Sequence, residues 1–340
     1  MKRILLIFLL FASSIFAAGP KVAGYFPHWA GYSSFKPADV RYVFLTDIRY
    51  CCLEPSGSDL LFADENDKAN FTELVRLAKE NNVRVFVSIG GIGYEETIAS
   101  LSASNLEQAA RKFVSEHGID GFEIDGGEID FDGARNIASL ADALANAGFS
   151  VSLAIPGNAS LSEAISAVAG RIDAISLWFT DQMNANESAV KPNSNTTENI
   201  RVLAAFANAG IPREKLIAIL PLYGKSFEGV SSLGSSFTGI GSGNEGVLKY
   251  KELMDKFNRA DVYNVSFDNA SQSEIALSES EIIVFNGIPS MQAMARAVKE
   301  SGYGGIAVFD LTGDHKEPIV SLLVTINQIL RPEVDFKKKR

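Results

Sequence analysis

The 340-residue sequence predicts an α/β fold, a (β/α)₈ TIM barrel that carries a small α+β insertion. Eight short apolar runs, rich in β-branched residues, alternate with segments of helical periodicity along most of the chain. The runs are mostly apolar throughout, which is typical of parallel strands covered on both faces. Eight strands alternating with helices match a closed barrel. A doubly wound open sheet is the alternative, because counting the units does not establish closure.

The predicted strands are brief, and helical segments separate them. They span residues 22–26, 42–47, 83–88, 121–125, 150–155, 174–178, 216–220 and 305–309. Apolar residues recur at helical spacing in residues 69–81, 106–117, 136–147, 161–169, 197–209 and 290–301. Gly148, Gly210 and Gly302 follow three of these segments, at the position where glycine commonly ends a helix.

The interval between the seventh and eighth strands breaks this rhythm. It holds about 80 residues, far more than one βα unit needs. Residues 229–246 are rich in glycine and serine, residues 248–258 have a helical pattern, and residues 262–267 and 281–285 resemble short strands. We therefore expect an insertion over residues 228–289, within one domain that spans residues 18–332.

The two ends of the chain differ from this domain. Lys2 and Arg3 precede an apolar run and then small residues, which predicts a signal peptide over residues 1–17 and a secreted, extracellular or periplasmic protein. An uncleaved membrane anchor is the alternative, but the run is short for a membrane span. No later segment is long and apolar enough to cross a membrane. Residues 333–340 form a basic tail.

The composition excludes several classes of function. With 31 basic and 41 acidic residues, the net charge is 31 − 41 = −10, which disfavours binding to nucleic acid. The three histidines and two cysteines lack the spacing of a zinc site, so we expect no metal and no cofactor. No serine-hydrolase turn or phosphate-binding glycine loop is present. Carboxylates are plentiful, so we expect any catalysis to use them, and we expect the protein to be a monomer.

Cys51 and Cys52 are adjacent. The Cα atoms of ordinary disulfide partners lie farther apart than the 3.8 Å between consecutive residues. We therefore expect two half-buried thiols, with a disulfide between these neighbours as the alternative.

The densest acidic segment is D-G-F-E-I-D-G-G-E at residues 120–128. On a strand, residues two apart share a face, so Glu123, Asp125 and position 127 point together. Crowding of like charges can keep one carboxyl protonated near neutral pH, as a general acid requires. A calcium site or a solvated acidic turn is the alternative.

This segment resembles the signature D-G-x-D-x-D-x-E of family 18 glycoside hydrolases, the chitinases and their relatives. Six further segments are similar to family motifs, in the family's order: residues 22–29, 87–91, 154–156, 221–227, 246–252 and 304–309. The resemblance implies retaining hydrolysis of β-1,4-linked N-acetylglucosamine polymers, with the acetamido oxygen of the substrate as nucleophile. It also implies a Glu that protonates the glycosidic oxygen and an Asp, here Asp125, that orients the acetamide.

The departures from the family pattern fall in the site. Glu123 stands where the family has Asp, and Gly127 stands where it has the catalytic Glu. Glu128 follows one residue late, and a bulge at the two preceding glycines would turn it into the site. Thr180 replaces the Tyr that donates to the acetamide, and Phe309 replaces the Trp beneath the sugar. Lys225 replaces the usual Arg.

Two hypotheses follow. In the first, the protein is an enzyme whose catalytic residues are Glu128, Asp125 and, less favoured, Glu123. In the second, it is a chitinase-like lectin that binds chitin-like polysaccharides or oligosaccharides without cleaving them. In both, the predicted substrate-binding residues lie at the strand ends: Tyr25, Trp178, Asp181, Tyr223 and Phe309.

Overall fold

The computed structural model describes residues 19–258 and 262–334. The predicted signal peptide at residues 1–17 and residues 335–340 of the predicted tail lie outside the described residues. In the part of the chain that the structure describes, no helix is both long enough and apolar enough to cross a membrane.

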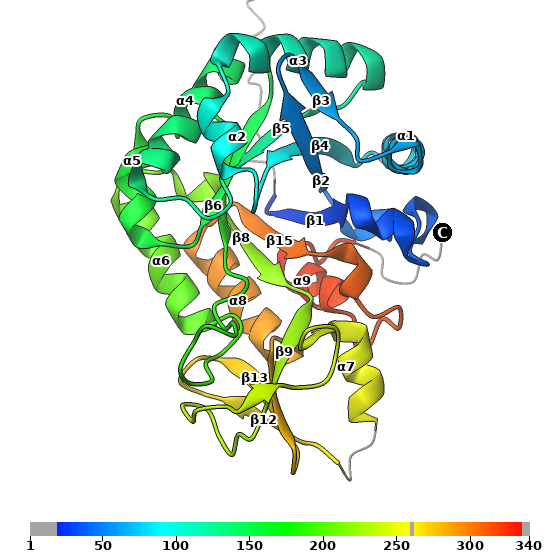
Figure 1. Ribbon diagram of the computed structural model, residues 1–340, viewed down its shortest axis with the longest axis vertical. Coiled ribbons are helices and arrows are strands. Elements are labelled where there is room, and N and C mark those ends of the chain that lie inside the picture. Colours follow the sequence, from blue (N-terminus) through cyan, green and yellow to red (C-terminus); the bar gives the residue numbers. More distant parts are fainter. Residues whose placement is uncertain (1–18, 259–261, 335–340) are drawn as a thin grey trace, which may run out of the picture.

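Eight parallel strands close into a barrel, which confirms the predicted fold class (Figure 1). Their order is β1-β15-β8-β7-β6-β5-β4-β2, and pairing of β1 with β2 closes the ring. The strands are β1 (Lys21–Pro27), β2 (Asp47–Ser56), β4 (Arg84–Gly90), β5 (Gly121–Asp125), β6 (Val151–Pro156), β7 (Ala174–Trp178), β8 (Leu216–Pro221) and β15 (Gly305–Phe309). A short strand, β3 (Asp59–Leu61), extends β2 as an antiparallel hairpin.

Seven of the eight predicted strands coincide with barrel strands, and the second was placed too early. Residues Tyr42–Phe44 form a turn of 3₁₀ helix, and β2 begins at Asp47. The misplacement has a physical cause. Tyr42 and Phe44 are buried while Val43 is exposed, so this turn shows the alternating burial that a strand would show.

Helices surround the barrel. They are α1 (Glu65–Glu80), α2 (Glu95–Ser100), α3 (Ala103–His117), α4 (Phe131–Asn146), α5 (Ser162–Ser166), α6 (Thr196–Asn208), α8 (Ile288–Ser301) and α9 (Leu322–Leu330). Polar side chains cap several of them: Asp64 accepts the Asp67 N–H at the start of α1, and Ser102 accepts the Asn105 N–H at the start of α3. Gly302 ends α8 in the left-handed conformation, as predicted.

The barrel wall separates two apolar regions. Outward-facing strand residues and the helices form the larger core, which includes Phe71, Leu74 and Phe122. The barrel interior holds a smaller cluster of mainly small residues around Tyr25, among them Ala23, Ala154 and Ala307. These small side chains leave room in the interior for polar groups and for the cleft at the strand ends.

A second sheet lies between β8 and β15 in sequence and forms the lower end of the molecule in Figure 1. Its members are β9 (Tyr223–Glu228), β10 (Gly239–Ile240), β11 (Val247–Lys249), β12 (Asn264–Asp268), β13 (Ser273–Leu277) and β14 (Glu281–Phe285), with α7 (Tyr250–Phe257) beside them. All pairings within this sheet are antiparallel. Since β9 starts two residues after β8 ends, the sheet is joined directly to the barrel rim.

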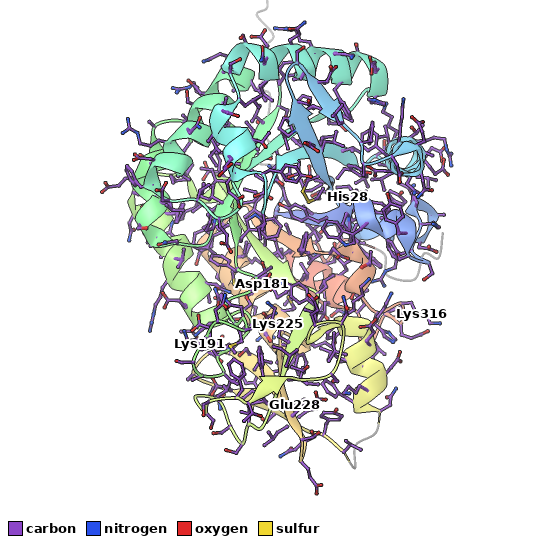
Figure 2. The ribbon with its side chains drawn as sticks, in the orientation of Figure 1. His28, Asp181, Lys191, Lys225, Glu228 and Lys316 are labelled. Atoms are coloured by element: carbon purple, nitrogen blue, oxygen red, sulfur yellow. A yellow bond between two sulfur atoms is a disulfide. The ribbon has the colours of Figure 1, made fainter. Side chains whose placement is uncertain are left out.

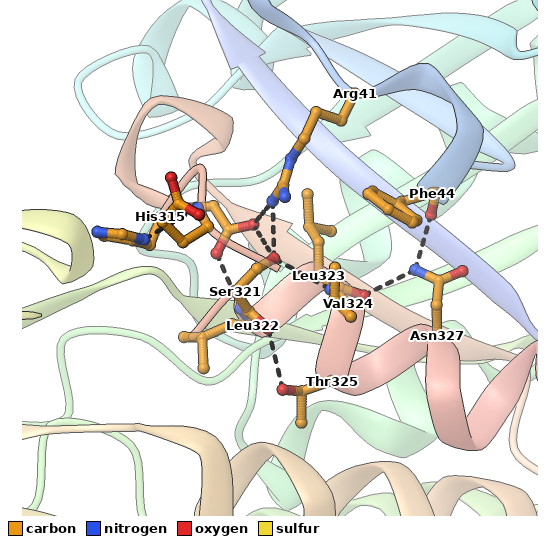
Figure 3. Close-up of polar contacts among 11 residues, drawn as sticks. Arg41, Phe44, His315, Ser321, Leu322, Leu323, Val324, Thr325 and Asn327 are labelled. Carbon is orange, nitrogen blue, oxygen red and sulfur yellow. Dashed lines mark hydrogen bonds and ion pairs between the residues drawn. The ribbon is translucent and has the colours of Figure 1, made fainter. Parts of the chain in front are cut away.

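Hydrogen bonds tie the last helix to the segment that precedes β2 (Figure 3). Arg41 binds Asp314 and donates to the Ser321 hydroxyl at 2.7 Å. Asn327 of α9 donates from Nδ2 to the carbonyl oxygen of Phe44 at 3.0 Å. The contacts fix the end of the described chain against its beginning, where the barrel closes.

Candidate active site

A cleft of about 400 Å³ opens at the carboxyl ends of the barrel strands. Parallel barrels place their functional residues at this end. The residues that line the cleft are His28, Trp29, Cys51, Cys52, Gly90, Gly91, Ile92, Tyr94, Asp125, Gly127, Glu128, Pro156, Trp178, Thr180, Asp181 and Phe309. Five of the predicted site residues therefore lie on its wall: Asp125, Glu128, Trp178, Asp181 and Phe309. The other three do not line the cleft: Tyr25 and Glu123 are fully buried in the barrel interior, and Tyr223 is the first residue of β9.

Glu123 lies in the barrel interior beneath the cleft and is fully buried. The Tyr25 hydroxyl donates to its Oε1 at 2.8 Å, and the Arg49 guanidinium forms an ion pair with its Oε2 at 3.7 Å. The hydroxyls of Ser152 and Ser176 each donate to Oε2 at 3.4 Å. The arrangement gives this carboxylate a cation and several donors, as a buried charge requires.

Asp125 stands two residues further along β5, at the floor of the cleft, and is 3% exposed. Its Oδ1 accepts the Gly127 N–H at 3.0 Å and the Trp178 Nε1–H at 3.2 Å. Burial raises the pKa of Asp125 to about 7, and the Glu123 charge adds to this rise, while the two hydrogen bonds oppose it. Near neutral pH this carboxyl is therefore present in both protonated and ionised forms.

Gly127, the residue that stands where the signature D-G-x-D-x-D-x-E has Glu, has no space for a side chain. Its φ is +63°, a left-handed conformation that favours glycine. A Cβ here would lie 2.5 Å from Oε1 of Glu95 and 2.8 Å from the carbonyl oxygen of Gly91. The carboxylate of Glu95 thus fills the space where a side chain at position 127 would begin. Glu95 is not among the residues predicted from the sequence.

Glu95 begins α2 and holds the loop that follows β5. Its Oε1 accepts the Glu128 N–H at 3.0 Å, and its Oε2 accepts the Gly93 N–H at 2.9 Å. Partial burial raises its pKa, but the backbone donors outweigh this effect and leave the pKa below its ordinary value. Glu95 is accordingly a structural anion at neutral pH and a poor proton donor.

Glu128 lies on the rim of the cleft with an exposed side chain. Strand β5 ends at Asp125, and the two glycines that follow form a turn. This turn brings Glu128 to the same cleft as Asp125. The backbone of Glu128 is bound by Glu95, whereas its carboxylate faces solvent.

Aromatic rings form much of the cleft floor. The ring centroids of Tyr25, Trp178 and Phe309 lie 5.0–5.6 Å apart, in tilted and edge-to-face arrangements. Trp29, which is 43% exposed, approaches Phe309 with a centroid distance of 6.2 Å. Trp178 and Phe309 present apolar surface to the cleft, which suits the apolar face of a sugar ring.

Asp181 belongs to a separate polar group at the junction of barrel and insertion. Tyr223 donates its hydroxyl to Oδ2 of Asp181 at 2.6 Å, and Lys225 forms an ion pair with Oδ1. Figure 2 shows Asp181 close to Lys225 of β9, with His28 further up in the view. Burial and the Asp181 charge raise the pKa of Tyr223 well above its ordinary value.

Cys51 and Cys52 form a disulfide, which corrects the expectation of two thiols. That expectation assumed a trans peptide bond. The bond between these residues is cis, and their Cα atoms lie 3.0 Å apart. Both residues line the cleft.

The comparisons with known proteins agree with this architecture. The family model "Glycosyl hydrolases family 18" matches residues 21–314. The chain belongs to glycosyl hydrolase family 18. Endochitinase 1 of the fungus Metarhizium robertsii is 24% identical over 93% of this chain and 87% of its own length.

Solved structures of low sequence identity share the fold of this family 18 protein. The group IV chitinase of Ostrinia furnacalis superposes with a TM-score of 0.81 at 20% identity, covering 92% of this chain and 99% of that one. Human YKL-39, described as a pseudo-chitinase with retained chitooligosaccharide binding properties, superposes with a TM-score of 0.81 at 16% identity, covering 92% and 100%. Proteins that share this fold therefore include a chitinase and a protein described as a pseudo-chitinase.

Proposed function

We propose that this family 18 protein binds oligosaccharides of β-1,4-linked N-acetylglucosamine in the cleft and lacks efficient hydrolysis. The observation that carries the proposal is the buried Asp125 on an aromatic floor, with no room for an acid at position 127. The names of its relatives, chitinases and a pseudo-chitinase, support the same class of ligand.

Asp125 provides a binding group for the N-acetyl substituent. Both of its internal hydrogen bonds are made to Oδ1, which leaves Oδ2 for a ligand. An ionised Asp125 accepts the acetamide N–H, and a protonated one donates to the acetamide oxygen. Trp178 and Phe309 then pack against the sugar ring.

The proton donor of the family mechanism is missing from its usual position. Glu95 and the Gly91 carbonyl exclude a side chain at Gly127, and Glu95 has a lowered pKa. Thr180 replaces the family's acetamide-binding Tyr, and its hydroxyl lies on a much shorter side chain. The position that carries the acid in the family signature therefore offers no group to protonate the leaving oxygen.

A second candidate is acetamide-assisted retaining hydrolysis with Glu128 as the acid. One observation favours it, namely that Glu128 lines the same cleft as Asp125. In that case Asp125 would orient the acetamide and Glu128 would reach the glycosidic oxygen from the rim.

Binding and cleavage of chitotetraose separate the two candidates. We expect calorimetry to show that the wild type binds chitotetraose. In a separate cleavage assay, we expect the wild type to release no more reducing ends than a protein-free sample. Asp125→Ala should weaken binding about tenfold, the loss that one buried hydrogen bond produces. The second candidate would be established if the wild type and the surface control Glu107→Gln release reducing ends and Glu128→Gln does not. Absence of binding by the wild type would contradict both.

We also propose that residues 1–17 direct export and that the mature protein is a secreted monomer. Expression with the full leader should give an extracellular or periplasmic product whose mass lacks these residues. A product that retains them in the membrane fraction, or a dimer in light scattering, would contradict this part of the proposal.

A further inference from the structure

The cleft of this protein contains a disulfide. Cys51 and Cys52 are the two cysteines of the whole chain, and they are bonded to each other in the middle of β2. Cys51 is 4% exposed and packs in the barrel-interior cluster, while Cys52 is partly exposed against the same cluster. The sulfur pair therefore forms part of the cleft wall and does not link distant parts of the fold.

An irregularity in β2 places both residues on the inner side of the barrel. Tyr50 pairs with Val87 of β4, but the next pairing joins Leu53 to Ile89, so two residues of β2 stand opposite one of β4. Tyr50 and Leu53 both belong to the outer core, whereas Cys51 and Cys52 contact the interior cluster. The extra residue thus puts two side chains where a regular strand would place one.

The disulfide and Asp125 border the same small space. Gly91 has a φ of +99° and no side chain. The point that a Cβ of Gly91 would occupy lies 3.5 Å from Sγ of Cys52 and 3.4 Å from Oδ2 of Asp125. A methyl-sized group at this point would touch the sulfur in van der Waals contact, while a polar group bonded to it could reach the carboxyl oxygen.

An N-acetyl group has this combination of a methyl group and an amide. We propose that the Cys51–Cys52 disulfide is the apolar wall that contacts the acetamide methyl of the bound glycan, so that affinity depends on whether the pair is oxidised. The inference rests on the proposed binding function and goes beyond it by assigning two specificity-determining residues. The disulfide is uncharged and polarisable, and it offers apolar surface beside a carboxyl that supplies the polar contact.

Reduction of the pair changes this wall. A dithiol reagent attacks one sulfur as its thiolate and forms a mixed disulfide, and its second thiol then displaces the cysteine. The reagent leaves as a cyclic disulfide, and its two electrons and two protons remain on Cys51 and Cys52 as two thiols. The sulfurs are then no longer bonded, and each side chain can rotate away from the methyl contact.

The test compares oxidised and dithiothreitol-reduced protein in calorimetric titrations with chitotetraose and with the glucosamine tetramer, which lacks acetyl groups. We expect reduction to weaken chitotetraose binding about three- to tenfold, the effect of losing one apolar contact, and to leave glucosamine tetramer binding unchanged. Mass spectrometry confirms complete reduction. Since the chain has no other cysteine, the variant Cys51→Ala/Cys52→Ala should bind like reduced wild type and ignore the reagent.

Glycan should also slow the reduction of the wild-type disulfide by dithiothreitol, a measurement that does not depend on whether a variant folds. Unchanged chitotetraose affinity after complete reduction, or equal reduction rates with and without saturating chitotetraose, would overturn the inference and leave the binding function intact. If the oxidised wild type binds no chitotetraose, the proposed function fails and this inference fails with it.

Discussion

Two carboxyl groups on one strand occupy contrasting surroundings. Glu123, in the barrel interior, is enclosed with the Arg49 cation, the Tyr25 hydroxyl and two serines. Asp125, at the cleft floor, is equally enclosed but has one indole and one backbone donor, and no cation contacts it among the described residues. Its pKa rises to about 7. Both carboxyls are buried, but of the two only Glu123 has a cation in contact with it within the described residues.

The largest expected effect comes from removing the interior cation. Arg49→Leu would leave Glu123 buried without its charge partner, and we expect the free energy of unfolding to fall by about 3–5 kcal/mol. Urea unfolding measures this loss. Arg76→Leu, which removes only exposed ion pairs on α1, should leave the unfolding midpoint unchanged. If the additional change Glu123→Gln did not recover stability, the contrast between the two carboxyls would be wrong.

The next effect concerns the cleft carboxyl and depends on pH. Below the unfolded pKa, about 4, a folded-state pKa of about 7 for Asp125 has no effect on stability. Stability falls as the pH rises from about 4 to about 7, where only the unfolded state is ionised, and changes little above that. Asp125→Asn keeps the acceptor and removes the charge. We expect it to stabilise the protein by about 3–4 kcal/mol at pH 8 and by almost nothing at pH 4. Unfolding curves at both pH values measure the difference, and an equal effect at each would contradict the assignment.

A smaller effect is expected at the turn above Asp125. Gly127→Ala would place a Cβ against Glu95 and the Gly91 carbonyl, and we expect a loss of about 2–3 kcal/mol. Gly57→Ala is the matched control, because Gly57 has a φ of +58° but no atom near the position of a Cβ. It should cost about 1 kcal/mol through its backbone conformation alone. Equal losses for the two variants in thermal unfolding would show that the space at Gly127 is not filled.

The smallest effect is expected where a paired carboxyl is open to solvent. The Asp181 side chain is 46% exposed, although Lys225 and Tyr223 both contact it. Lys225→Met should therefore change the free energy of unfolding by about 0–1 kcal/mol. A loss as large as that of Arg49→Leu would show that the cation matters equally in both regions, which would remove the basis of the comparison.

Much of the scaffold was predictable because its signals are local. Seven barrel strands were placed by their apolar runs, and Gly302 marked the end of α8. Helix α9, which was not predicted, has nine residues and is apolar over most of its length. A short apolar run of this kind does not distinguish a helix from a strand. The second strand was predicted to begin at Tyr42, where the structure has a 3₁₀ turn. A short 3₁₀ turn and a strand can share one burial pattern.

The site was predictable only in part. Asp125, Glu128, Trp178, Asp181 and Phe309 were expected at the cleft and line it. Arg49 and Glu95 were not expected, because each acts on β5 or its following loop from a distant part of the sequence. Arg49 lies beyond the predicted second strand, which ends at residue 47, and becomes part of β2 only in the structure. Glu95 had no distinguishing signal, since an acidic residue at a helix start is common.

The sequence by itself determined the alternation of strands and helices, the family, and the fact that position 127 lacks a carboxyl group. These depend on residue type and order. Tertiary structure alone decided where Glu128 lies, that Glu95 fills the space beside Gly127, and that two neighbouring cysteines form one wall of the cleft. The reason is physical: hydrogen bonds, burial and bulges act between chain segments that only folding brings together, and they determine the ionisation and orientation of each site group.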